Sequence, residues 1–137
     1  NKHDRSVISL WTKIPEKGDK VVVCSSLKDA LCLWSNTGIP AIAVQGEGYS
    51  MSDTAISELK RRFNKIYILF DNDKAGLEDG DKLSKQTGFI NLVLPPFPEG
   101  KDVSDLYKSV GKTKFIEIIS RLFNLEEVDD DFLKLPY

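Results

Sequence analysis

The sequence has few of the residues that mark zinc-binding, disulfide-linked or membrane-spanning proteins. It contains two cysteines, Cys24 and Cys32, and a single histidine, His3. Two cysteines without a Cys-x-x-Cys pair do not make the usual cysteine-rich zinc site, and we expect them to be small, apolar side chains in a reducing compartment. No apolar run approaches the roughly 20 residues that cross a bilayer, and no signal peptide opens the chain. We therefore expect a cytoplasmic protein that does not contact membranes.

An excess of charge of one sign is also missing. The 137 residues carry a formal net charge of -2, which argues against a surface that is basic all over and coats nucleic acid, although a local basic face remains open. The length, with 41% hydrophobic and 29% charged residues, fits one globular domain. Because Asn1 is not an initiator residue, we expect the chain to be a fragment of a longer protein.

Short apolar runs alternate with segments of helical periodicity along most of the chain. Strands are predicted at residues 20–24, 41–44, 65–70 and 89–94, and helices at 27–37, 52–63, 74–86, 104–110 and 113–123. Strands separated by single helices are typical of βαβ units. The fold class is therefore α/β, with a central parallel sheet of about four strands and helices on both faces. Residues 7–11 are a candidate for an additional edge strand.

This pattern divides the chain into three parts. Residues 1–19 are a lead-in, residues 20–124 form the domain, and the acidic residues 125–137 are predicted to be a tail or linker. Within the domain, Ser26 with Asp29 resembles a capping box at the start of the first helix. The basic residues 60–62 close the second helix, where cations complement the helix dipole, so we do not interpret them as a nucleic-acid patch.

The most informative loop follows the third predicted strand. In parallel sheets, ligands bind at the carboxyl ends of the strands, which selects the loops at 25–26, 46–48 and 71–76. Asp71 and Asp73 place two carboxylates directly after a buried strand. This arrangement suits Mg²⁺, which takes few protein carboxylates and keeps water for substrate phosphates. The alternative is that the two aspartates serve only as turn and N-cap residues.

Three other motifs were compared with the same loops. An EF-hand loop that starts at Asp71 fails, because Ala75 and Lys82 occupy two of its ligand positions. A dinucleotide fingerprint is weak, because Gly46 and Gly48 are not followed by a third glycine. A phosphatase of the haloacid dehalogenase type remains a distant alternative, since its Asp-x-Asp motif normally lies on the first strand.

Taken in order, four segments resemble the Toprim domain of primases, topoisomerases and related nucleases. They are residues 21–31, 43–46, 68–76 and 100–106, and the resemblance covers residues 20–111. The Phe-Asp-x-Asp-x-Ala-Gly run at 70–76 is typical of the primase-like members, among them phage and bacterial replicative primases. One departure stands out, because Ser25 occupies the position of the glutamate in the family's first motif. We hypothesise that Glu47 replaces that carboxylate.

The resemblance implies roles for individual residues. Asp71, Asp73 and Glu47 are the expected catalytic residues, and the same three with Asp102 are the expected metal ligands. Contacts to phosphate or nucleotide are expected from Lys74, Lys101, Ser25 and Gly46. Asp29 matches a further aspartate of the family's first motif, without an assigned role.

The implied function is that of the catalytic domain of a phage-type primase or primase-helicase in a bacterial cell or phage-infected host. It would join ribonucleotides by Mg²⁺-dependent transfer, with Mn²⁺ as a substitute, on a single-stranded DNA template. A zinc-binding domain or helicase module, in the same or another chain, is the expected partner, and the isolated domain is expected to prime weakly or not at all. The alternatives are a degenerate Toprim module that binds nucleic acid or a replication partner, and a Toprim nuclease.

Overall fold

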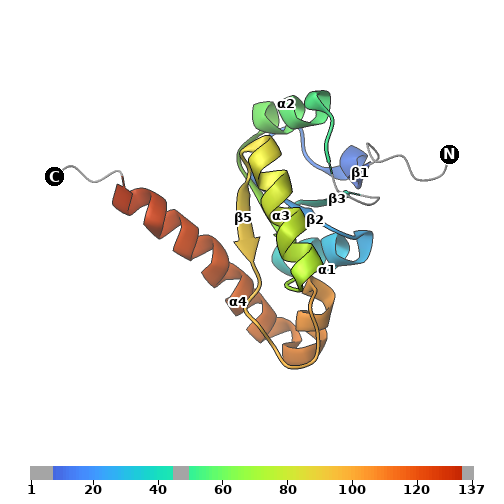
Figure 1. Ribbon diagram of the computed structural model, residues 1–137, viewed down its shortest axis with the longest axis vertical. Helices are drawn as coiled ribbons and strands as arrows, with labels where there is room; N and C mark the ends of the chain where they lie inside the picture. The colour runs from blue at the N-terminus through green and yellow to red at the C-terminus, as the bar shows by residue number, and fades with distance from the viewer. Residues whose placement is uncertain (1–7, 45–49, 134–137) are drawn as a thin grey trace.

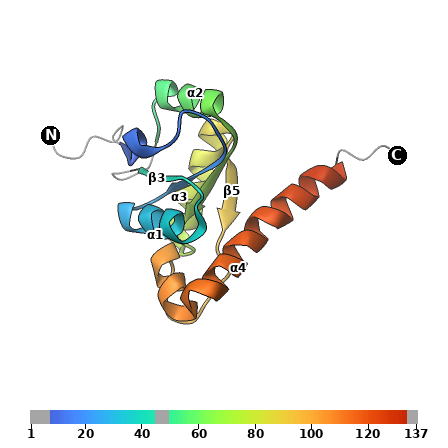
Figure 2. The same ribbon diagram turned by 180° about the vertical axis from the view of Figure 1, so that it is seen from behind.

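The structure is a computed structural model, and it describes residues 8–44 and 50–133, with side chains up to residue 125. Its strands are β1 (Ile8–Ser9), β2 (Gly18–Cys24), β3 (Ala41–Val44), β4 (Phe63–Phe70) and β5 (Ile90–Val93). Its helices are the 3₁₀ turn η1 (Trp11–Lys13), α1 (Leu27–Thr37), α2 (Asp53–Arg62), α3 (Lys74–Thr87) and α4 (Val103–Leu133). Figures 1 and 2 show the sheet between the helices, with α4 projecting from the body.

The sheet is mixed but mostly parallel, in the order β1-β3-β2-β4-β5. β2, β3, β4 and β5 run parallel to their neighbours, and the two-residue β1 pairs antiparallel with β3 at one edge. The four predicted parallel strands are confirmed, and β1 is the fifth. Since β2, β3 and β4 run parallel, their carboxyl ends lie at the same edge of the sheet.

Each face of the sheet is covered by its own pair of helices. α2 and α3 pack on the side chains of one strand face, including Val21, Val23 and Ile68. α1 and α4 pack on the other face, which presents the alternate residues Val22, Tyr67 and Leu69. Residues that alternate along a strand point to opposite faces, so burial on both sides explains why β2 and β4 read as continuous apolar runs. The predicted helices on both faces are confirmed.

The chain signals that begin and end the helices act as predicted, with one exception. Ser26 and Ser52 cap α1 and α2, and Gly38 and Gly88 end α1 and α3 in the left-handed region, with φ of 77° and 83°. Phe63, predicted to lie on the apolar face of the second helix, instead begins β4 in an extended conformation. The pattern misled because Phe63 fills the same buried cluster as that helical face, while its backbone pairs with the start of β2.

The two short C-terminal helices predicted from the sequence are joined at Gly111. They form one long element, α4, but Gly111 has φ 81° and ψ 172°, so the helix is kinked there. The kink lets the first turns pack against α1 while Phe115 and Ile119 reach the core. The backbone of α4 continues to Leu133, through most of the acidic segment. A role of that segment as a tail or linker stays a prediction. No helix among the described residues has the length and apolar character needed to cross a membrane.

Candidate metal centre at the carboxyl edge of the sheet

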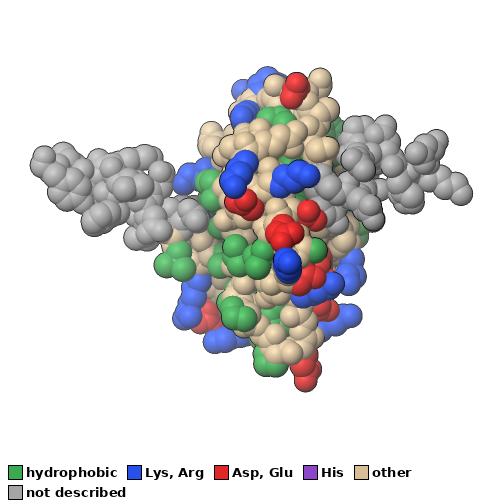
Figure 3. All heavy atoms as spheres, viewed as in Figure 1, with side chains coloured by type: hydrophobic (Ala, Val, Ile, Leu, Met, Phe, Trp, Pro, Cys, Tyr) green, Lys and Arg blue, Asp and Glu red, His purple; other side chains and the backbone are tan. Residues whose placement is uncertain are grey.

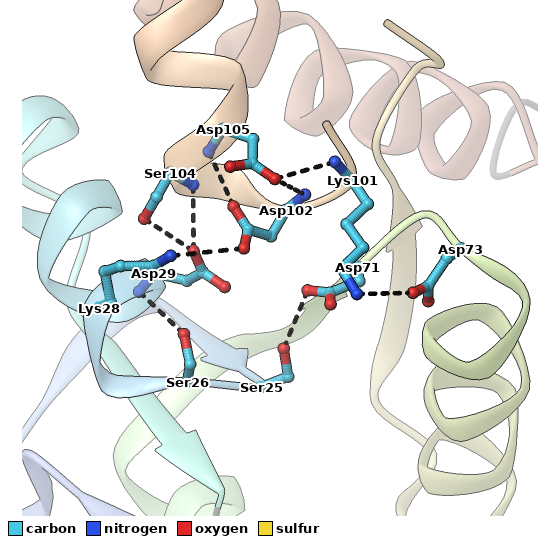
Figure 4. Close-up of polar contacts among 10 residues, drawn as sticks. All are labelled: Ser25, Ser26, Lys28, Asp29, Asp71, Asp73, Lys101, Asp102, Ser104 and Asp105. Atoms are coloured by element: carbon cyan, nitrogen blue, oxygen red, sulfur yellow. Dashed lines mark hydrogen bonds and ion pairs between the residues drawn. The ribbon is translucent and has the colours of Figure 1, made fainter. Parts of the chain in front are cut away.

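Three segments that are distant in sequence meet at the carboxyl edge of the central strands. Ser25 follows β2, Asp71 follows β4, and Asp102 directly precedes the first turn of α4. Asp29 reaches the same place from the first turn of α1. Figure 4 shows these side chains around one small region, with Lys28 and Lys101 at its margins. The strand order explains the meeting, because neighbouring parallel strands deliver their following loops to one edge.

A group of three carboxylates lies at the centre of this region. One oxygen from each of Asp29, Asp71 and Asp102 lies within 4.8 Å of the other two. Asp71 and Asp102 were predicted as metal ligands, and the structure brings them together. Asp29, which had no assigned role, completes the group. We call these three residues the carboxylate cluster.

Asp29 is the most buried member of the carboxylate cluster, with only 2% of its surface exposed. Its Oδ1 accepts one hydrogen bond from the backbone N–H of Ser104 at 3.0 Å and another from the Ser104 hydroxyl at 2.8 Å. Its own backbone N–H donates to the Ser26 hydroxyl at 3.2 Å, which is the capping half of the predicted box. The carboxylate does not return to the cap, because it is held across the domain by Ser104.

Asp71 is half-buried beside the other two carboxylates. The Ser25 hydroxyl donates to Asp71 Oδ1 at 3.2 Å. Burial raises the pKa of Asp71, and the nearby charges of Asp29 and Asp102 raise it further, while the Ser25 hydrogen bond opposes them. The serine that replaces the family's glutamate therefore contacts the central aspartate directly.

Asp102, like Asp71, has a raised pKa, and its side chain also caps α4. Burial raises the pKa of Asp102, against the hydrogen bond that its Oδ1 accepts from the backbone N–H of Asp105 at 2.7 Å. Its other oxygen lies 3.7 Å from Lys28 Nζ. Asp105 returns the contact by accepting hydrogen bonds from the backbone N–H groups of Lys101 and Asp102. This reciprocal arrangement fixes the loop before α4.

Asp73 lies outside the carboxylate cluster and has different contacts. Its Oδ1 caps α3 by accepting a hydrogen bond from Gly76 N–H at 2.8 Å, and its Oδ2 lies 3.1 Å from Lys101 Nζ. The Gly76 hydrogen bond lowers the pKa of Asp73, and Lys101 lowers it further. Lys101, a predicted phosphate contact, is thus paired with the Asp73 carboxylate. Lys74, the other lysine predicted to contact phosphate, is exposed at the start of α3. The roles of Asp73 as a catalytic residue and metal ligand, and of Lys74 and Lys101 as phosphate contacts, stay predictions.

Several residues of this edge were not singled out from the sequence. They are Ser104, Asp105, Lys28 and Asn72, whose backbone N–H donates to the Lys101 carbonyl at 2.7 Å. Asp105 had a detectable signal, because it follows Asp102 by three residues at a helix start. Glu47 and Gly46, predicted as ligand and phosphate contact, lie outside the described residues.

A family model described as Toprim-like matches residues 22–107, which is more than half of the chain and includes the whole carboxylate cluster. The chain belongs to the Toprim-like family. The Gene 57 protein of Mycobacterium phage D29 is 34% identical over 82 residues, which cover 60% of this chain and 51% of that protein. The DNA primase of Listeria innocua is 32% identical over 79 residues, or 56% of this chain and 13% of the primase. The chain thus spans about half or less of these relatives.

A solved structure supports the Toprim fold independently. The primase fragment of the bacteriophage T7 primase-helicase superposes with a TM-score of 0.63 at 17% identity, covering 86% of this chain and 50% of that fragment. Toprim domains bind divalent metal ions, and the residues at this edge fit such an ion. Carboxylate oxygens are the ligands that Mg²⁺ prefers, and burial together with neighbouring carboxylates raises the pKa values of Asp71 and Asp102, which a bound cation would offset.

Proposed function

We propose that this chain is the Toprim catalytic domain of a phage-type DNA primase or primase-helicase, and that it catalyses ribonucleotidyl transfer for primer synthesis. The observation that carries the proposal is the carboxylate cluster, in which Asp29, Asp71 and Asp102 come from three separate segments. Asp29 and Asp102 also accept backbone hydrogen bonds, as structural aspartates at helix starts do, but that role alone does not bring carboxylates together. Three that converge at the carboxyl edge of a parallel sheet, with repulsion between them, favour a cation site.

Within this proposal, Mg²⁺ supplies charge stabilisation for phosphoryl transfer. Asp71 and Asp102 would hold it, with Asp29 kept in place by Ser104. Asp73 and Lys101 lie beside the cluster as an ion pair, from which the Lys101 ammonium would turn to the phosphates of a nucleotide as a mobile point charge. Lys74 is placed similarly at the exposed start of α3. Each of these groups would orient the reacting atoms or neutralise the charge on the phosphates, which is most of what a protein does in phosphoryl transfer.

The metal site lacks the glutamate of the family's first motif, whose position Ser25 occupies, and Glu47 is our proposed replacement. Glu47 follows β3 by three residues, and β3 is the direct neighbour of β2, after which Ser25 stands. A carboxylate that enters from the β3 loop would approach the same edge of the sheet. Gly46 is proposed to let a nucleotide phosphate approach the backbone there.

The proposed partners are a single-stranded DNA template, ribonucleotides, and a zinc-binding domain or helicase module of the same or another chain. The T7 neighbour is a primase fragment of a primase-helicase, which supports the last of these by analogy. Two other functions remain in competition. Ser25 at the glutamate position favours a degenerate module that binds nucleic acid or a replication partner, and the carboxylate cluster by itself also suits a nuclease.

The first experiment is Mn²⁺ binding, measured by titration calorimetry or electron spin resonance. The wild-type chain is compared with Asp71→Ala combined with Asp73→Ala, and with a control that removes two exposed aspartates elsewhere, Asp19→Ala combined with Asp81→Ala. Binding that only the first pair abolishes supports the metal site. Template-directed incorporation of ribonucleotides by the wild type then supports a primase, whereas strand cutting indicates the nuclease. No binding at millimolar Mn²⁺ contradicts the catalytic proposal and favours the degenerate module.

A further inference from the structure

A groove of about 660 Å³ runs between α1 and the first turns of α4, outside the carboxylate cluster. Figures 1 and 2 both show these two helix segments side by side at one end of the molecule. Residues of α1 from Lys28 to Asn36 form one wall, and residues of α4 from Ser104 to Lys112 form the other. We call it the α1–α4 groove.

The charged side chains that line the α1–α4 groove are all basic, on a chain whose net charge is -2. They are three lysines, Lys28, Lys108 and Lys112, and none is a carboxylate. Lys28 lies 3.7 Å from Asp102. Among the side chains that the structure describes, Lys108 and Lys112 have no carboxylate within 4.0 Å. Two exposed ammonium groups in one groove, neither in an ion pair with a described carboxylate, fit a ligand with several negative charges. On the face that carries α3, acidic and basic side chains intermingle (Figure 3).

The same groove also offers apolar and aromatic surface. Leu31, on the outer side of α1, is 48% exposed and contributes apolar surface to the groove. Tyr107 is half-buried, and its ring stands edge-to-face against Phe115, with the centroids 5.6 Å apart and the planes at 85°. This contact holds the tyrosine ring in place. Lysines that follow a backbone and a fixed aromatic ring on which a base stacks are the two components of single-strand binding grooves.

The groove leads directly to the carboxylate cluster. Ser104 lines the groove and also holds Asp29, while Lys28 lies on the groove and contacts Asp102. Figure 4 shows Lys28 and Ser104 beside Asp29 and Asp102 of the cluster. A strand lying in the groove would therefore have one end at the proposed metal site.

We propose that the α1–α4 groove binds single-stranded nucleic acid, with Lys108 and Lys112 on its phosphates and Tyr107 against a base, and leads it to the carboxylate cluster. This placement rests on the proposed primase function for its direction, whereas the binding itself requires no catalysis. A duplex is a poorer ligand, because its bases are stacked on one another and unavailable to Tyr107.

The test is fluorescence anisotropy with a labelled single-stranded oligonucleotide, in EDTA so that the metal site plays no part. Lys108→Ala combined with Lys112→Ala is compared with a matched pair from the opposite edge of the sheet, Lys17→Ala combined with Lys60→Ala. Each phosphate contact to a single strand contributes about 0.7 to the slope of log K against log salt. We expect the groove pair to lower the slope by about 1.4 and the affinity roughly tenfold at 0.15 M salt. The control pair retains the slope.

Cys32 provides a second readout because it lines the groove, whereas Cys24 is buried in the core. The oligonucleotide should slow alkylation of Cys32 by N-ethylmaleimide, and Tyr107→Ala should weaken this protection more than Tyr107→Phe. Equal slopes for the two lysine pairs, an unprotected Cys32, no binding at low salt, or displacement by poly-glutamate but not by a competing strand would each overturn the proposal. Failure of Mn²⁺ binding with groove binding intact would instead contradict the catalytic function alone.

Discussion

Ser104 on α4 donates two hydrogen bonds to one carboxylate oxygen of Asp29 on α1, although the two residues are 75 positions apart in the chain. The buried Asp29 side chain is thereby held beside Asp71 and Asp102. A carboxylate with so little exposure is stable only where hydrogen-bond donors replace water. The contact therefore joins the stability of the domain to the geometry of its carboxylate cluster.

Ser104→Ala should weaken both properties. It removes the hydroxyl that donates to Asp29 at 2.8 Å and leaves the backbone N–H as donor. Losing a hydrogen bond to a buried charged group costs about 1.5–3 kcal/mol in the free energy of unfolding, measured by urea denaturation. Mn²⁺ affinity should fall as well, because one hydrogen bond in place of two then holds Asp29. Ser104→Thr, which keeps a hydroxyl, is the control, and an unchanged Mn²⁺ affinity in the alanine variant would remove Asp29 from the metal site.

Asp71→Asn should stabilise the metal-free protein at neutral pH. The pKa of Asp71 is raised in the folded state by burial and by Asp29 and Asp102, so folding favours its protonated form. Its contribution to stability is therefore greatest at low pH and falls as the pH rises through the raised pKa. In EDTA, urea denaturation between pH 4.5 and 7.5 should show a weaker pH dependence for the variant. A variant less stable than wild type at pH 7 would contradict repulsion within the cluster.

Much of this fold follows from local patterns in the sequence. β2 and β4 are recognisable because strands buried on both faces are continuously apolar, and Asp71 is recognisable because it directly follows such a strand. Phe63 was wrongly assigned to the second helix. It is the first residue of β4, but its side chain packs in the same buried cluster as the apolar face of α2. Periodicity alone does not separate these two environments.

The part of the site that local patterns did not supply depends on distant contacts. The burial of Asp29 beside Ser104 and the position of Lys28 near Asp102 arise from the packing of α1 against α4. Asp73 shows the opposite case, since one carboxylate oxygen caps α3 while the other contacts Lys101. Asp71 and Asp73 are two positions apart in the sequence, yet only Asp71 belongs to the carboxylate cluster.

Gly76→Ala should destabilise the domain and displace the β4–α3 loop. A Cβ at this position would collide with the backbone carbonyl of Asp71, so the first turn of α3 has to move. Overpacking of this kind costs about 1–3 kcal/mol, more than the helix propensity that alanine adds. Gly80→Ala is the control in the same helix, because its Cβ would meet only the end of the Asn91 side chain, at 2.9 Å. Urea denaturation should separate the two variants, and equal stabilities would contradict the close packing at Gly76.

Arg62→Ala should be strongly destabilising, although the sequence predicted for residues 60–62 only a favourable interaction with the helix dipole. Arg62 is 8% exposed, donates hydrogen bonds to the carbonyl oxygens of residues 14–16, and lies over the Trp11 ring. Removing it leaves these carbonyls without donors, at a cost of about 2–4 kcal/mol. Arg61→Ala, on the exposed side of the same turn, should change little. If Arg62→Ala loses as little stability as we expect for Arg61→Ala, the contacts of Arg62 do not stabilise the domain.

Glu47→Gln should reduce Mn²⁺ affinity at least tenfold if Glu47 replaces the family's glutamate. Glu16→Gln, which removes one negative charge before β2 at the opposite edge of the sheet, is the matched control. Position 25 faces the carboxylate cluster, since the Ser25 hydroxyl contacts Asp71. A glutamate restored there, Ser25→Glu, should therefore recover the affinity lost in Glu47→Gln. Unchanged Mn²⁺ affinity in Glu47→Gln would show that Asp29, Asp71 and Asp102 suffice without it. Loss without rescue by Ser25→Glu would show that the two positions are not equivalent, and that this site departs from the primase pattern in more than one residue.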